Sequence, residues 1–367
     1  MRFVYFTHSL VSCWNHGNAH FQRGVLRALA ARGHAVAAYE PADSWSRENL
    51  ARDQGDALIQ DFAADFPGLT ARSYAGIEEL EAAVDDADVV IVHEWTDPAV
   101  VAALGRLRRR ARFQLLFHDT HHRAVSAPDA LRRFDLSAYD AVLAFGATLA
   151  AVYERWGWGG RAFVWHEAAD TALFHPPAHE GLREGCVWVG NWGDGERGAE
   201  LEAFLLGPAA QAGMALDIHG VRYPAEALAT LARYGARYHG WVANAQVPGL
   251  FARHAMTTHV PRRFYTEALP GIPTIRVFEA LACGIPLLTA PWSDTEGLFR
   301  PGEDYLVARD GTQMRAHMTM LRDDPARAAA LAASGLARVR ERHSCDIRAG
   351  ELLGIVARLA QPARVAV

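Results

Sequence analysis

Residues 270–292 read PGIPTIRVFEALACGIPLLTAPW, and this stretch decides how the rest of the chain is interpreted. The prolines and glycine of its first four residues disfavour a helix there, and Thr274 is predicted to be an N-cap whose hydroxyl accepts a backbone amide. Gly284 is predicted to adopt the left-handed conformation that ends a helix, and Pro286 prevents its continuation. Residues 287–290 then form a buried strand. The stretch therefore predicts a loop, a short helix and a strand of a parallel sheet.

Arg276 and Glu279 lie three residues apart on this helix, away from its apolar stripe. One interpretation is a surface ion pair, which would contribute roughly 0.2–0.5 kcal/mol. The other is a binding site for an anionic, hydroxyl-rich ligand, because a helix N-terminus beside a parallel sheet favours such ligands. The Pro/Gly loop before the helix and the glycine stop after it favour the binding site.

Composition limits the classes of protein to consider. The chain has 367 residues, which favours two domains, and its net charge of −5 argues against a nucleic-acid binder. It contains no lysine, so any phosphate must be bound by arginine or by backbone amides. The four cysteines lie far apart, without a metal-binding or disulfide pattern. With no signal peptide and no long apolar segment, we expect a soluble, cytoplasmic protein without an integral membrane segment.

Strand and helix patterns alternate along the chain, which predicts two Rossmann-like, doubly wound α/β domains facing across a cleft. We expect an N-terminal acceptor domain over residues 1–169, a linker over 170–184, a nucleotide-sugar domain over 185–342, and a C-terminal helix within 343–367 that packs back on the first domain. The predicted strands cover residues 2–7, 34–39, 88–93, 112–117, 141–145, 162–165, 186–189, 216–219, 236–239, 256–260, 287–290 and 304–307, with a short one near 71. The predicted helices cover residues 18–32, 48–62, 77–84, 98–110, 148–156, 199–212, 224–234, 247–254, 311–321, 325–340 and 345–359.

Several segments resemble the GT-B glycosyltransferases, and within them the CgeB-like group of the group 1 family. The strongest is TIRVFEALACGIPLL at 274–288, followed by VWVGNWGDGERGAEL at 187–201. Weaker likeness extends to three further segments. They are HEAADTALFHP at 166–176, RVRERHSCDIRAGELL at 338–353 and, in the N-terminal half, HGNAHFQRGVLRALAARGHAV at 16–36. The resemblance implies transfer of a sugar from a nucleoside diphosphate sugar, with UDP as the expected nucleotide and no tightly bound cofactor. The acceptor would be a glycan, a natural product or a protein.

The resemblance also implies a set of donor-binding residues in the C-terminal half. Glu279 would hold the ribose hydroxyls, Arg276 and the amides at the helix start would face the diphosphate, and Arg197 would neutralise it from the glycine-rich turn. Fixed positive charge suits this chemistry, because the departing nucleotide gains negative charge. The alternative for Arg197 is a solvated loop residue. The complete predicted set is Gly190, Asn191, Arg197, Gly271, Thr274, Ile275, Arg276 and Glu279.

One position departs from the family pattern. The retaining group 1 enzymes carry two glutamates, the second on the helix discussed above, and Gly271 occupies the place of the first. Either Glu267, the nearest upstream acid, or the amides around Gly271 would then meet the sugar. The stereochemical outcome stays open.

An inverting reaction needs a general base, and His, Asp and Glu residues follow several predicted strands of the N-terminal half. Candidates there are His8, His16, His93, Glu94, His118 and Asp119, of which we select His16, His118 and Asp119 as catalytic. Each alone could equally be structural, since strand-end loops collect polar residues. Trp14 and Trp95 lie at the same strand ends and could stack on an acceptor or simply pack.

Two patterns suggest a metal, and both are weak. HDTHH at 118–122 follows a predicted strand rather than lying on a helix, so it lacks the helical i, i+4 histidine pair of zinc sites. Asp86 and Asp88 lie at the start of a strand, at the amino end of the sheet. We therefore predict a metal-independent glycosyltransferase without a metal site. The rival functions are a sugar-nucleotide epimerase or hydrolase on the same fold, and a non-catalytic nucleotide-sugar binding protein.

Overall fold

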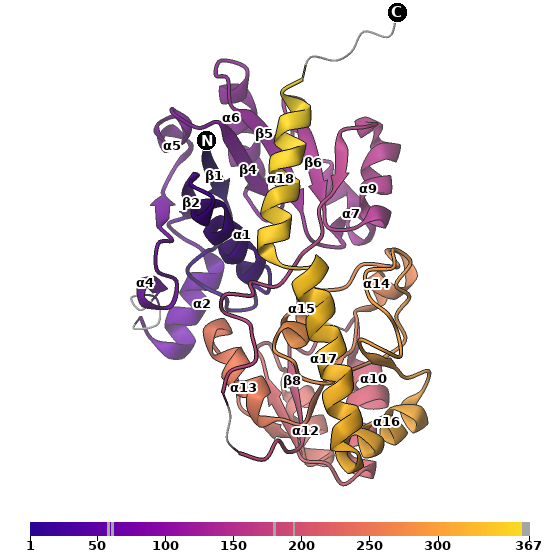
Figure 1. Cartoon of the computed structure of the whole chain (residues 1–367). Coiled ribbons are helices and arrows are strands. Elements are labelled where there is room, and N and C mark those ends of the chain that lie inside the picture. Colours follow the sequence, from indigo (N-terminus) through magenta and orange to yellow (C-terminus); the bar gives the residue numbers. More distant parts are fainter. Residues whose placement is uncertain (57–58, 60–61, 179–180, 194, 362–367) are drawn as a thin grey trace, which may run out of the picture. The chain divides into compact units, whose positions relative to one another are not determined.

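The computed structural model describes residues 1–361 except 57–58, 60–61, 179–180 and 194. By its internal contacts the chain divides into unit 1, formed by Met1–Glu167 and Cys345–Val367, and unit 2, formed by Ala168–Ser344. The segment predicted to be a linker, residues 170–184, is part of unit 2. Each unit contains one parallel sheet with flanking helices (Figure 1), which confirms the predicted fold class of two Rossmann-like domains.

The sheet of unit 1 has seven parallel strands in the order β3-β2-β1-β4-β5-β6-β7. Its central strands are apolar and buried along almost their whole length, as expected for a parallel sheet covered on both faces. The strand order reverses between β1 and β4: strands β2 and β3 are added on one side of β1, and β4 to β7 on the other. At this point Phe3 of β1 pairs with Val89 of β4. The strands are β1 Arg2–Phe6, β2 Ala35–Pro41, β3 Ala71–Tyr74, β4 Val89–His93, β5 Gln114–Asp119, β6 Ala141–Ala144 and β7 Ala162–Val164.

The helices predicted for unit 1 form except in one stretch, and the short helices α7 and α8 were not predicted. The helix expected over 48–62 begins earlier and ends at Gln54, because Gly55 has a left-handed φ of 80°; positions 57–58 and 60–61 lie outside the described residues. The segments are α1 Ala19–Ala31, α2 Trp45–Gln54, α4 Phe62–Asp65, η1 Ile77–Glu79, α5 Leu80–Val84, α6 Pro98–Arg108, α7 Arg123–Ser126, α8 Pro128–Leu131, α9 Ala147–Tyr153, η2 Glu154–Trp158 and α18 Cys345–Leu359.

The C-terminal helix α18 belongs to unit 1, although it follows unit 2 in the sequence. Figure 1 shows it lying along α1 and the sheet. Trp165 donates its indole N–H to the carbonyl of Arg348 at 2.9 Å, and the Arg348 guanidinium donates to the carbonyl of His166 at 3.0 Å. Gln114 donates to the carbonyl of Val356 at 3.0 Å. These bonds join the helix to the ends of β5 and β7.

The sheet of unit 2 has six parallel strands in the order β10-β9-β8-β11-β12-β13, so the same reversal occurs between β8 and β11. The strands are β8 Cys186–Val189, β9 Leu216–His219, β10 Arg237–Tyr238, β11 Met256–His259, β12 Leu287–Thr289 and β13 Leu306–Val307. The helical segments are α10 Gly198–Leu201, η3 Glu202–Leu206, α11 Gly207–Gln211, α12 Ala225–Arg233, η4 Asn244–Gln246, α13 Val247–Arg253, α14 Arg263–Glu267, α15 Ile275–Ala282, α16 Gly311–Asp323 and α17 Pro325–Arg342.

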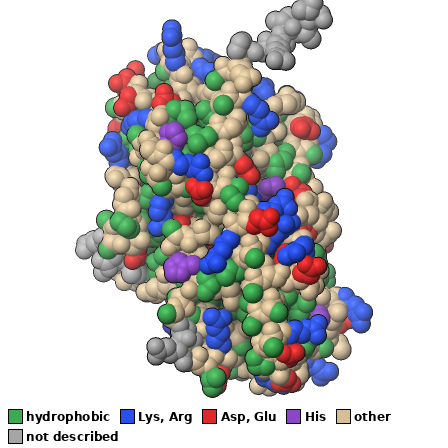
Figure 2. Space-filling model, viewed as in Figure 1, with side chains coloured by type: hydrophobic (Ala, Val, Ile, Leu, Met, Phe, Trp, Pro, Cys, Tyr) green, Lys and Arg blue, Asp and Glu red, His purple; other side chains and the backbone are tan. Residues whose placement is uncertain are grey.

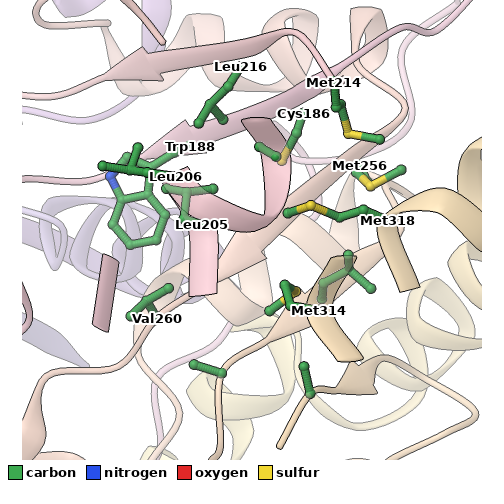
Figure 3. Close-up of a cluster of buried hydrophobic side chains, with 14 of the residues drawn as sticks. Cys186, Trp188, Leu205, Leu206, Met214, Leu216, Met256, Val260, Met314 and Met318 are labelled. Carbon is green, nitrogen blue, oxygen red and sulfur yellow. The ribbon is translucent and has the colours of Figure 1, made fainter. Parts of the chain in front are cut away.

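One face of this sheet packs on α10, η3, α11 and α16, and Figure 3 shows the resulting core around Trp188, Leu205, Met256 and Met314. The run from α10 to α11 contains a π turn at Glu202–Leu206. Pro208 follows it directly and has no amide hydrogen to continue regular i to i−4 bonding, which accounts for the local change of pitch.

On the surface shown in Figure 2, arginine and acidic side chains are interspersed, so positive and negative charges do not form separate patches there.

Among the described residues, none of the helices combines the length and hydropathy needed to cross a bilayer.

Helix α15, the centre of the stretch 270–292, packs closely against α17 at Gly335. A methyl group on Gly335 would lie 2.6 Å from Leu281 Cδ2 and 2.8 Å from the carbonyl oxygen of Asp304. Only a residue without a side chain lets the two helices approach this closely, so Gly335 fixes the position of α15.

We predict that Gly335→Ala lowers the free energy of unfolding by about 1–3 kcal/mol, because overpacking outweighs the gain in helix propensity. Gly354→Ala is the control, since Gly354 is an exposed helical glycine with nothing within 4 Å of the added methyl group. That change should raise stability by up to about 1 kcal/mol. Urea unfolding followed by circular dichroism measures both. Equal stabilisation by the two substitutions would contradict the close packing.

Candidate active site

The loop before α15 is held in a conformation that requires glycine. Gly271 has a left-handed φ of 92°, and a methyl group there would collide with the Thr295 hydroxyl. At the other end of the helix, Gly284 has a φ of 61°, which confirms the predicted helix stop. The prediction for Thr274 is half right. It occupies the N-cap position, but its hydroxyl lies 3.3 Å from His259 Nε2 and makes no capping bond, because β11 brings that imidazole beside it.

The Arg276–Glu279 pair forms, and it is not a surface pair. Glu279 is completely buried, while Arg276 keeps 29% of its side chain exposed. The second carboxylate oxygen of Glu279 accepts a hydrogen bond from Asn244 Nδ2 at 2.8 Å. Burial raises the pKa of Glu279, although Arg276 and Asn244 oppose the rise. A buried carboxylate is costly to maintain, so its position in the middle of α15 needs a reason beyond helix stability.

Arg197 is not a solvated loop residue either. Its guanidinium donates to the Asn191 carbonyl at 2.9 Å, to Asn191 Oδ1 at 2.8 Å and to the Val260 carbonyl at 3.1 Å. It also lies over the Trp188 ring, 5.0 Å from the centroid. Burial, together with the positive charges of Arg262 and Arg276, lowers the pKa of Arg197 to about 10. The glycine-rich turn and α15 therefore carry guanidinium groups within electrostatic range of each other.

Arg262 is the residue that the sequence analysis missed. It donates to Glu196 Oε2 at 2.6 Å and to Asn191 Oδ1 at 3.2 Å, so it shares that oxygen with Arg197. The signal was its place three residues after β11, beyond the carboxyl end of a predicted strand. We call Arg197, Arg262 and Arg276 the arginine cluster.

The arginine cluster lies where the strand order of unit 2 reverses, the usual place for ligands in such sheets. Gly190 and Asn191 follow β8, Arg262 follows β11, and Thr274, Ile275 and Arg276 begin α15. The imidazole of His259 is also there, with a pKa lowered to about 3 by burial and by the charge of Arg197. The structure thus brings the predicted donor-binding residues to one edge of unit 2.

A pocket of about 490 Å³ opens beside this edge, next to Asn244. Its lining includes Trp241, Gln246 and Arg253, together with the stacked imidazoles of His219 and His239, whose centroids are 4.7 Å apart. His239 is held by Asp217 through a 2.6 Å contact. The pocket offers flat aromatic walls and a few polar groups.

The predicted catalytic residues belong to unit 1, at the carboxyl ends of β1 and β5. His118 is fully buried, with Nδ1 2.5 Å from the Tyr5 hydroxyl and its ring 4.8 Å from that of Trp165. Burial lowers its pKa to about 3. His16 is 4% exposed and lies 4.2 Å from the ring of His8.

His93 connects these residues, because its ring lies 6.0 Å from that of His16 and 5.7 Å from that of His118. Burial lowers the pKa of His16 and of His93 as well. We call His8, His16, His93 and His118 the histidine cluster. Its imidazoles are neutral at pH 7.

Two buried carboxyl groups lie beside the histidine cluster. Asp119 accepts from the Tyr153 hydroxyl at 2.7 Å and from the His121 amide at 3.1 Å, and burial raises its pKa to about 6. Glu94 forms an ion pair with Arg123, and burial together with Asp119 raises its pKa to about 8. At pH 7 the raised value favours the protonated form of Glu94, whereas Asp119 becomes mainly protonated only below about pH 6.

The weak metal patterns lie apart from this edge or do not assemble. Asp88 accepts the backbone amide of Arg2 at 2.7 Å, at the amino end of β4. Within the part of the chain that the structure describes, no three His, Cys, Asp or Glu side chains are grouped as metal ligands.

Comparison with known proteins gives two family matches. A family model described as glycosyl transferase-like matches residues 197–354, and one described as glycosyltransferase family 4 matches residues 20–173. Among curated protein sequences, none matches the chain significantly. Neither family match reaches the narrower CgeB-like group, which stays a prediction.

Solved structures of similar fold cover nearly the whole chain. Sucrose-phosphate synthase from Thermosynechococcus elongatus has 16% identity and a TM-score of 0.70, over 98% of this chain and 99% of that one. HepE from Anabaena, solved with UDP and glucose, has 13% identity and a TM-score of 0.67, over 98% and 100%. An α-glucosyltransferase solved with UDP and a 13-mer DNA has 11% identity and a TM-score of 0.68, over 97% and 99%. At these identities the likeness concerns the fold.

We predict that unit 1 loses stability as the pH rises, through Glu94. The raised pKa means that the folded chain holds this proton more tightly than the unfolded chain. The stabilisation is complete below the unfolded value of 4.5 and is lost as the pH rises through about 8. Between about pH 5 and pH 8.5, the wild type should lose roughly 2–4 kcal/mol more unfolding free energy than Glu94→Gln.

The control for this prediction is Glu351→Gln, which removes another arginine-paired glutamate of unit 1, one that is 43% exposed. It should leave the pH dependence of the wild type unchanged within about 0.5 kcal/mol. Urea unfolding at both pH values measures the difference. Identical slopes for the wild type and Glu94→Gln would refute the prediction.

Proposed function

Because the chain belongs to the GT-B glycosyltransferases, we propose that it moves a sugar from a nucleoside diphosphate sugar, with UDP as the preferred nucleotide, to an acceptor hydroxyl. The acceptor hydroxyl attacks the anomeric carbon, the bond from that carbon to the β-phosphate oxygen breaks, and its electron pair leaves with the nucleoside diphosphate. The acceptor proton passes to a base. The net charge of −5 supports an acceptor that is not a nucleic acid.

The observation that carries this proposal is the arginine cluster. Three guanidinium groups gather at one edge of unit 2. Within the described residues, Arg262 pairs with the carboxylate of Glu196 and Arg276 with that of Glu279. Arg197 is held by carbonyl and amide oxygens, which leave its positive charge in place. A diphosphate supplies the missing anions, and its charge grows during transfer, when fixed cations help most.

We assign the ribose to Glu279, as the resemblance implies. An ionised carboxylate accepts hydrogen bonds from two neighbouring hydroxyls, and Asn244 and Arg276 hold this one in position. The nucleobase then belongs in the pocket next to Asn244, where Trp241 and the stacked imidazoles offer aromatic surfaces. Phosphate, ribose and base follow one another from the arginine cluster to that pocket.

We also propose that transfer is metal-independent. Guanidinium groups match phosphate oxygens in pairs and cannot lose their proton at physiological pH, so they supply the charge that a divalent cation would otherwise provide. The arginine cluster supports this because its members come from three separate segments that converge on Asn191 and α15.

For the acceptor step we propose His16 as the base, with His118 and Asp119 positioning it. Burial keeps His16 neutral, which leaves it able to accept a proton. The Tyr5 hydroxyl holds His118, whose ring packs on that of His93, and the His93 ring packs in turn on His16. Asp119 accepts the backbone amide of His121 and so fixes the chain there. A base within the histidine cluster suits an inverting reaction.

We predict that UDP at about 100 times its dissociation constant stabilises the chain by roughly 2.7 kcal/mol, and that GDP at the same concentration stabilises it less. Glu279→Gln should weaken UDP binding by about 1.5–3 kcal/mol, since the bonds lost are to a charged group. Thermal denaturation with and without nucleotide measures each shift against the variant's own baseline. The shift should persist in EDTA, because arginine compensates the diphosphate.

The matched control is Glu303→Gln. Glu303 also pairs with an arginine at i, i+3, but it is 63% exposed. Its variant should keep the full UDP shift. Equal losses in both variants, or a shift that requires a divalent cation, would contradict the assigned donor site.

We predict that His16→Gln lowers the kcat of sugar transfer by about 10²–10⁴ while the UDP shift is retained, because the general base is lost and the donor site is intact. His34→Gln is the control, since His34 lies at the amino end of the same sheet, beside Met1. Steady-state kinetics with the donor that gives the largest shift measure both variants. Isomerised or hydrolysed donor without any transfer would instead support the epimerase or hydrolase.

A further inference from the structure

Trp95 is an exposed tryptophan that is nonetheless held in place. It directly follows Glu94 at the end of β4, where the strand order of unit 1 reverses, and 42% of it is exposed. The Arg123 guanidinium lies 4.0 Å from its ring centroid, and the ring of His121 meets it edge-on at 5.3 Å. Large aromatic side chains are normally buried, so a fixed and exposed indole at this point suggests a binding role.

Arg123 is itself anchored, which fixes the orientation of the indole. Its Nε donates to Glu94 Oε2 at 2.9 Å, and its Nη2 donates to both the carboxylate and the carbonyl oxygen of Glu94. Glu94 is fully buried, and its amide donates to the carbonyl of His118 at 2.9 Å. Trp95 is thus tied through Arg123 and Glu94 to the central strands β4 and β5. A surface that is rigid before binding loses little entropy when a ligand stacks on it.

The same edge contains several buried polar atoms without a hydrogen-bond partner among the described residues. Glu94 Oε1, Thr96 Oγ1, His16 Nε2 and His118 Nε2 have no hydrogen-bond partner within the described part of the chain. Each belongs to a residue that is at most 4% exposed. Buried polar atoms are nearly always paired, and an unpaired one costs about 1–3 kcal/mol. Their concentration at the ends of β4 and β5 and in the loop after β1 points to a ligand rich in hydrogen-bonding groups.

We propose that Trp95 and this polar edge form an acceptor subsite for a carbohydrate ring. The inference rests on the proposed function and adds the chemical class of the acceptor to it. A pyranose has an apolar C–H face that stacks on an indole, and hydroxyl groups that both donate and accept hydrogen bonds. It therefore matches both features of the edge. A flat phenolic acceptor would cover the indole but would satisfy few of the polar atoms.

The test is fluorine NMR of the full chain labelled with 5-fluorotryptophan, in which Trp95→Phe identifies the Trp95 resonance. The probes are the methyl glycosides of glucose, galactose, mannose and N-acetylglucosamine, and 4-methylumbelliferone as the phenolic alternative. At least one glycoside should move the Trp95 resonance in a saturable way. Thr96→Val should weaken that binding by roughly 5- to 10-fold, because one hydroxyl partner is lost.

Trp158 supplies the matched control. It precedes β7, at the amino end of the same sheet, and Arg161 lies 4.7 Å over its ring, so it is another arginine-stacked tryptophan. Its resonance should not respond to any glycoside, and Trp158→Ala should leave the affinity unchanged. In transfer assays, Trp95→Ala should raise the acceptor KM by about 2- to 10-fold and leave the UDP-induced thermal shift intact.

The outcomes separate this inference from the function on which it rests. A response of Trp95 to 4-methylumbelliferone but to no glycoside would overturn the carbohydrate class. No response to any probe in a chain that UDP stabilises would overturn the subsite and leave the donor site standing. A glycoside response in a chain that binds no nucleoside diphosphate would support the subsite and remove the proposed transfer reaction.

Discussion

A parallel sheet covered on both faces leaves room for polar side chains only beyond the ends of its strands. Both units of this chain obey that constraint with the same strand order, so each presents its polar residues where the order reverses. In unit 2 the result is the arginine cluster beside Asn191 and α15. In unit 1 it is the histidine cluster and the carboxyl groups of Glu94 and Asp119. The shared topology thus gives each unit one polar edge at the same point of its sheet, and the two edges differ in chemistry.

The two edges differ because burial acts differently on their side chains. Guanidinium groups stay protonated even when burial lowers the pKa of Arg197 to about 10, so unit 2 keeps its charge. In unit 1, burial keeps the His118 imidazole unprotonated and raises the pKa of the Glu94 carboxyl group to about 8, so both are mainly neutral at pH 7. A cationic edge suits a diphosphate, and a neutral edge with many hydrogen-bonding atoms suits a hydroxyl-bearing acceptor. The proposed division between donor and acceptor follows from this difference.

Local sequence chemistry was enough to predict most of the helices and strands and to single out Arg276 and Glu279. Gly284 ends α15 because glycine adopts the left-handed conformation without strain, and the bounds of α18 follow from its apolar pattern. The misses at the site depend on partners distant in sequence. Thr274 does not cap its helix because β11 supplies His259. Arg262 is placed in the cluster by its contacts with Glu196 and with Asn191, which follows β8. The complete burial of His118 depends partly on Trp165, which α18 holds in place.

The pairs Arg276–Glu279 and Arg300–Glu303 show why spacing alone cannot identify a site. Both are arginine and glutamate at i, i+3, yet Glu279 is completely buried and Glu303 is 63% exposed. The difference arises from packing, since Asn244 contacts Glu279 and Gly335 of α17 lets α15 sink into unit 2. An apolar residue at position 279 would satisfy that packing at lower cost. A glutamate that remains buried there breaks the local rule that core positions are apolar, and such breaks concentrate at binding sites.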